Sequence, residues 1–80
     1  MLTEYLNAAM RHAEYEELPE GEGWYGHIVG VQGVYARAST PEDAAQELRS
    51  ALEDWLLFGL VNGLPIPALD GIELKATRVA

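Results

Sequence analysis

The sequence contains no cysteine, so no disulfide can compensate for a small core. It has a single lysine, and its arginines are scattered along the chain. Because nucleic-acid binding depends on Lys and Arg groups that neutralise phosphates, we expect no direct binding to DNA or RNA. The longest apolar run, Trp55 to Val61, is far shorter than the ~20 residues of a membrane span. Glu4 and Asn7 interrupt the stretch where a signal peptide needs an apolar core. We therefore expect a cytoplasmic protein without membrane contact.

The 80 residues are enough for one domain, which we place at residues 1–80. A chain of this length buries only somewhat over ~60% of its unfolded surface, so its core is thin. The sequence shows no cluster of side chains for a structural metal and no cofactor motif, so we expect neither. Small domains without such supports often gain stability by association. We therefore expect a homo-oligomer, most simply a dimer.

The charge balance is strongly acidic, with 13 acidic residues against 5 basic ones and a net charge of −8. Such a surface suits a basic protein partner, because opposite potentials attract. It is equally consistent with a device that only keeps the protein in solution. Charge alone leaves both interpretations open.

The strongest local signal is a long amphipathic helix from about residue 40 to residue 62. Thr40 is a good N-cap with an acid, Asp43, three residues later, and Pro41 suits the first helical position. Apolar residues then recur at spacings of three and four, which places them on one stripe. The stripe comprises Ala44, Ala45, Leu48, Ala51, Leu52, Trp55, Leu56 and Gly59. Gly63 and Pro65 predict where the helix ends.

The first third of the chain is less clear. Residues 2–11 have the periodicity of a short amphipathic helix. Residues 11–18 suit either a strand with Ala13 and Tyr15 on its dry face or a continuation of that helix. Residues 19–23, PEGEG, predict a turn.

Residues 24–31, WYGHIVGV, form the clearest predicted strand. Its large residues are not confined to one parity: Tyr25, Val29 and Val31 fall on one face, and Trp24 and Ile28 on the other. Both faces therefore need cover, one from the long helix and the other from the first helix or a second subunit.

A turn at residues 32–33 and a strand over 34–38 follow, and Ile72 to Val79 alternates like a final strand. The predicted fold class is α+β. A small antiparallel sheet, made of a three-strand meander and a C-terminal strand, packs on one long helix, with an additional N-terminal helix.

Three motifs in this order resemble the HicB-like antitoxin family. The first is EGEGWYGHIVGV, an acidic-glycine turn that leads into a strand, and the second is QGVYARASTPEDAAQEL, a strand that leads into the capped helix. The third is Gly63-Leu64-Pro65-Ile66-Pro67 after that helix. Together they cover about residues 13–68. Each motif is turn or cap chemistry, and the specificity lies in their order and spacing.

The resemblance implies a truncated RNase H-like domain that binds and neutralises a small basic HicA-type RNA-cleaving toxin. Many members of that family add a C-terminal DNA-binding segment. This sequence shows none before its last residue, Ala80, so we expect no promoter binding by this chain alone. An alternative is a stand-alone oligomeric structural or regulatory module of the same fold, without a toxin, whose first helix covers the former partner surface.

A metal-dependent nuclease is a remote alternative. Its two-metal site needs several convergent carboxylates, and the contributors would be Glu14 or Glu16 with Glu47. The predicted strands 24–31 and 34–38 contain no acid, so we expect no enzyme, no metal site and no catalytic residue. His12 and His27 lack a partner nucleophile nearby in sequence, and we expect structural roles for them.

The candidate partner-binding residues form an acidic cluster followed by a tryptophan. Charge complementarity would bring the cluster to a basic toxin, although a solvated face is the simpler interpretation. Trp24 could anchor an interface, but packing in the core is the stronger interpretation. The candidates are Glu14, Glu16, Glu17, Glu20, Glu22 and Trp24.

Overall fold

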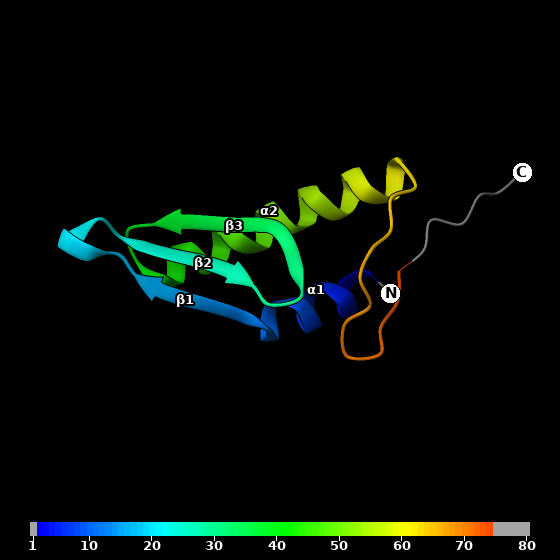
Figure 1. Ribbon diagram of the computed structural model, residues 1–80, viewed down its shortest axis with the longest axis horizontal. Coiled ribbons are helices and arrows are strands. Elements are labelled where there is room, and N and C mark those ends of the chain that lie inside the picture. The colour runs from blue at the N-terminus through cyan, green and yellow to red at the C-terminus, as the bar shows by residue number, and fades with distance from the viewer. Residues whose placement is uncertain (1, 75–80) are drawn as a thin grey trace, which may run out of the picture.

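The computed structural model describes residues 2–74 as a three-stranded antiparallel sheet with two helices (Figure 1). The element order is α1 (Leu2–Arg11), β1 (Ala13–Glu17), a short 3-10 turn (Pro19–Gly21), β2 (Trp24–Ile28), β3 (Val31–Ala38) and α2 (Pro41–Val61). The strands form a meander in the order β1-β2-β3, with β2 in the middle. The predicted α+β class is confirmed.

The long helix begins and ends as its sequence predicts. The Thr40 hydroxyl accepts a hydrogen bond from the Asp43 amide at 3.1 Å, which caps the first turn. At the other end Gly63 has φ +65°, the left-handed conformation that glycine adopts without strain. The Leu64 amide donates to the Gly59 carbonyl at 2.8 Å and the Gly63 amide to Leu60 at 3.3 Å, so the last carbonyls are paired in a Schellman motif.

The core lies between one face of the sheet, α2 and α1. From α2, the side chains of Leu48, Leu52 and Leu56 are fully or almost fully buried. The sheet contributes Ile28, Val31, Val34 and Ala36, and α1 contributes Tyr5, Leu6 and Ala9. In Figure 1, α1 lies beyond one end of the sheet, beside the second half of α2. It therefore extends the core along α2.

The segment after α2 returns across this core to α1. Ile66 packs against α2, so closely that a Cβ atom on Gly59 would stand 2.8 Å from its Cδ1. The buried Tyr5 hydroxyl donates a hydrogen bond to the Pro67 carbonyl at 2.5 Å, and burial raises the pKa of that hydroxyl. Leu69 is buried beside Gly30. The motif that follows the helix therefore closes one side of the core.

Residues 13–17 form a strand, so of the two alternatives for residues 11–18 the strand is right and the helix is wrong beyond Arg11. The predicted final strand, Ile72 to Val79, falls largely outside the described residues. Within residues 2–74, Ile72 forms only an isolated bridge with Leu69.

The predicted strand over 24–31 was too long and its turn was misplaced. The chain turns at residues 29–30, where Gly30 has φ +93°, and β3 already begins at Val31. A register shift at Ile28 then places Val31 on the face that packs on α2, where it is 3% exposed, and not beside Tyr25 as predicted. Gly33 lies inside β3 with φ +90° at this irregularity, and residues 32–33 are not the turn.

Candidate partner-binding surface

The two faces of the sheet differ in cover. Cross-strand partners lie on the same face, so the register Ala13↔Ile28, Tyr15↔Gly26 and Gly26↔Ala36 defines the face that packs on α2, here called the inner face. The intervening partners, Glu14↔His27, Glu16↔Tyr25 and His27↔Tyr35, define the opposite, outer face. No helix or strand of residues 2–74 packs on the outer face.

Aromatic rings dominate the centre of this outer face. Tyr25 stacks on His27 with ring centroids 5.8 Å apart and on Tyr35 at 6.3 Å. Tyr35 is 63% exposed, although it is one of the largest side chains of the sheet. Tyr25 and His27 are half-buried, so Tyr35 presents the largest exposed ring of this row. A row of stacked rings that no other element covers is a surface that a protein partner can cover.

Charged groups flank the aromatic row on both sides. Glu14 Oε1 lies 3.6 Å from His27 Nε2, and the Glu14 side chain is largely exposed whereas that of His27 is half-exposed. Glu16 is the cross-strand partner of Tyr25 on the β1 side, and Arg37 is its partner on the β3 side. The Arg37 guanidinium donates to the Glu22 carbonyl at 3.1 Å. The outer face therefore has an apolar centre, a carboxylate edge and one guanidinium.

The structure brings only part of the candidate acidic cluster onto this face. Glu14 and Glu16 lie there, whereas Glu17 alternates to the inner side as the partner of Trp24. Glu20 lies in the 3-10 turn with φ +59°. Glu22 follows that turn and lies beside Arg37. Trp24 is half-buried on the inner side of the sheet.

The sequence interpretation missed Tyr25, His27, Tyr35 and Arg37 as members of one surface. The signal was present in the odd-numbered positions of residues 34–38, where Tyr35 and Arg37 alternate with apolar residues. It became usable only once the register placed those positions beside Tyr25 and His27.

The carboxylates considered for a metal site are separated by the sheet. Glu14 projects from the outer face, and Glu47 is an exposed residue of α2, which packs on the inner face. Among residues 2–74, no three His, Asp or Glu side chains are close enough together to hold one metal ion. No helix in this part of the chain combines the length and apolar character needed to cross a membrane.

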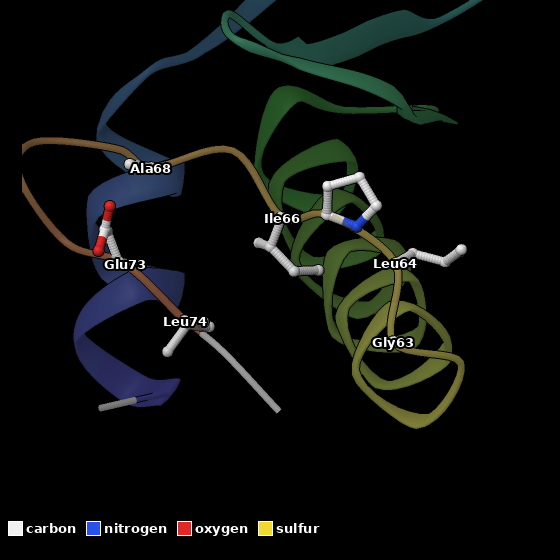
Figure 2. Close-up of a pocket in the computed structure, with 7 residues that line it drawn as sticks. Gly63, Leu64, Ile66, Ala68, Glu73 and Leu74 are labelled. Carbon is white, nitrogen blue, oxygen red and sulfur yellow. The ribbon is translucent and has the colours of Figure 1, made fainter. Parts of the chain in front are cut away.

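A hollow lies where the returning segment passes between the two helices (Figure 2). It is lined by Gly63, Leu64, Pro65, Ile66, Ala68, Glu73 and Leu74. Figure 2 shows Ile66 beside α2, and Glu73 and Leu74 in front of α1. Glu73 is the one ionisable side chain in this described lining, so the hollow offers no pair of groups for acid–base chemistry.

His12 has a partner of its own. Its Nε2 lies 2.8 Å from Asp70 Oδ1, and Arg11 reaches the other carboxylate oxygen at 3.4 Å. The hydrogen bond to His12 is the main reason that the pKa of Asp70 lies below its usual value of 3.8. This contact joins the returning segment to the end of α1 and the start of β1.

The lowered pKa of Asp70 predicts an acid-dependent loss of stability. Asp70 stabilises the fold fully above its unfolded-state pKa, and this contribution disappears as the pH falls through its lower, folded-state value. Asp70→Asn should flatten the fall in unfolding free energy, measured by urea denaturation, between about pH 5 and pH 2. Asp54→Asn, which removes an exposed carboxylate from α2, is the control. Identical pH slopes for the parent and Asp70→Asn would contradict the assignment.

The comparisons with known proteins agree with this architecture. The family model described as UPF0150-like matches residues 4–67. The crystal structure of TTHA0281 from Thermus thermophilus is similar, with a TM-score of 0.88 and 38% sequence identity, and the match covers 96% of this chain and 95% of that one. No protein of curated function matches. Because the family model spans most of the residues on which the sheet and both helices are built, the chain belongs to the UPF0150-like family.

Proposed function

We propose that this domain is a non-catalytic, HicB-like antitoxin that binds a small basic toxin of the HicA type through the outer face of its sheet. The observation that carries the proposal is the uncovered row Tyr25, His27 and Tyr35, flanked by Glu14 and Glu16. The UPF0150-like membership and the order of the three sequence motifs support the family assignment.

The geometry suits recognition of a basic protein. The net charge of −8 attracts a cationic partner over a distance, which raises the rate of encounter. Once the partner is docked, the exposed Tyr35 ring and the accessible part of Tyr25 supply apolar area at a small cost in side-chain entropy. The toxin would be neutralised because its RNA-binding surface is itself basic, and the acidic face would occupy it.

The position of α1 supports an open binding face. Tyr5, Leu6 and Ala9 of α1 are buried in the core on the α2 side. The helix is therefore held away from the outer face, where the stand-alone alternative would need it as cover.

The test is co-purification with the product of any adjacent small basic reading frame, followed by affinity measurement. We expect a stable complex that Glu14→Gln/Glu16→Gln weakens about tenfold, because two carboxylates at the interface edge are lost. Tyr35→Ala should weaken it at least as much. The control is Glu53→Gln/Asp54→Asn, which removes two exposed charges from α2 and should leave the affinity nearly unchanged. Absence of a complex, or equal losses in both double variants, would contradict the proposal.

A further inference from the structure

The two edges of the sheet are protected unequally against pairing with another strand. β1 carries Glu14, Glu16 and Glu17 within five residues. β3 is eight residues long, VQGVYARA, and its one charged residue is Arg37. Natural edge strands commonly use charges, bulges or proline to prevent further pairing. The half of β3 from Tyr35 to Ala38 has no proline and follows a regular register, so it is available as a template.

The hydrogen bonds of the sheet show which backbone groups of β3 are free. The Leu18 amide donates to Gly23 at 2.8 Å and the Val29 amide to His12 at 3.1 Å, so odd-numbered residues of β2 direct their amides towards β1. Even-numbered residues of β2 must then face β3, where Gly26 and Trp24 oppose Ala36 and Ala38. The alternation leaves the amides and carbonyls of Tyr35 and Arg37 directed away from the sheet.

We propose that two copies of this chain pair through β3, antiparallel and centred on Ala36, to form one continuous six-stranded sheet. In this register Tyr35 opposes the partner's Arg37 and shares its outward backbone hydrogen bonds. Ala36 opposes the partner's Ala36 in a non-hydrogen-bonded pair. Every outer-face residue meets an outer-face residue, so the apolar inner faces also join.

The side chains favour this register over its neighbours. Arg37 would lie between Tyr25 of its own sheet and the partner's Tyr35, where a guanidinium is attracted to aromatic faces. Moving the centre to Arg37 would place two guanidinium groups directly opposite each other, which is repulsive. Moving it to Tyr35 would bring Gly33, whose φ is +90°, into the ladder and break its regular geometry.

At the level of Ala36, Leu48 of α2 packs beneath the middle of the sheet. A Cβ atom on Gly26 would stand 3.6 Å from Leu48 Cδ2 and 2.9 Å from the Tyr15 ring. Gly26 is the cross-strand partner of Ala36, so this contact lies at the level of the proposed twofold centre, where α2 covers the inner side of both β2 and β3. The pairing concerns the edge of the sheet, whereas the proposed toxin contact concerns its outer face. The two proposals can therefore fail separately.

The experiment uses the absence of native cysteine. Ala36→Cys places one thiol per chain at the proposed twofold centre, where the Cα atoms would be about 4.5 Å apart, within the range of a disulfide. Under mild oxidation it should form a covalent dimer nearly completely, whereas Glu16→Cys on the β1 edge should remain mostly monomeric. The reverse pattern, or no crosslink in a folded Ala36→Cys protein, would overturn the proposal.

A second measurement needs no substitution. In the parent chain at a concentration that gives a dimer by sedimentation, the amides of Tyr35 and Arg37 should exchange at least tenfold more slowly than after dilution to the monomer. The Ala36 amide, which faces β2, should be protected in both samples. A parent chain that is monomeric at millimolar concentration would overturn the proposal. The proposal would also be overturned if the amides of Tyr35 and Arg37 became protected from exchange only when a basic partner is added.

Discussion

Replacing Leu52 with alanine should cost this domain about 2–5 kcal/mol of unfolding free energy. Leu52 is 0% exposed in the middle of α2, between the sheet and α1. The substitution removes apolar contacts and leaves a cavity that neighbouring side chains can fill only partly. In a domain of this size the loss is comparable to much of the total stability. Chemical denaturation followed by circular dichroism measures it.

The matched control lies on the same helix. Leu57 is 63% exposed, so Leu57→Ala removes the same atoms without opening a cavity. Its unfolding free energy should stay within about 0.5 kcal/mol of the parent. If both variants lost similar stability, the inner surface of α2 would be wrongly assigned, or the exposed surface would be covered in a stable assembly.

Replacing Gly23 with alanine should cost about 3 kcal/mol, for two combined reasons. Gly23 has φ +105°, a conformation that residues with a side chain rarely adopt. A Cβ atom there would also stand 2.5 Å from the Ala38 carbonyl oxygen, which is backbone and cannot rotate away. The loss should appear as a lower melting temperature in calorimetry.

Gly21 separates the two causes. It has φ +70°, but a Cβ atom there would meet nothing within 4 Å. Gly21→Ala should therefore show only the backbone cost, about 1 kcal/mol. Equal losses at the two positions would mean that the contact between Gly23 and β3 contributes nothing.

Local chemistry in the sequence predicted the helices well. The cap at Thr40, the apolar stripe of α2 and its end at Gly63 all depend on neighbours within a few residues, and all three agree with the structure. Local patterns left residues 11–18 open between a strand and a longer helix, although within the strand alternative alternation gave the correct side for Ala13 and Tyr15.

The sheet was harder to predict because its register depends on distant residues. Both residues 29–30 and residues 32–33 contain a glycine that can turn the chain, and local preference could not choose between them. The register shift at Ile28 allows Val31 and Val34 both to reach the inner face, and burial of both favours the earlier turn. Strict alternation along one strand could not represent such a shift.

The candidate surface was predicted from charge, and the structure reorganises it around aromatic rings. The acidic cluster is contiguous in sequence, but strand alternation and the 3-10 turn distribute its members over different sides of the sheet. Tyr35 joins Tyr25 only through pairing of β2 with β3. Sequence patterns therefore identified the acidic character of the region. Which side chains lie next to one another on the surface could be determined only from the pairing register of the strands.

The central claim is that the outer face of the sheet is a protein-binding surface. The most direct measurement is an NMR titration of the isotope-labelled domain with the small basic partner. The account predicts that the largest shift changes fall on the rings of Tyr25, His27 and Tyr35 and on the amides of β1 and β2, with little change in α2. Changes concentrated on the exposed side of α2, around Leu57 and Phe58, with the three rings unaffected, would contradict it.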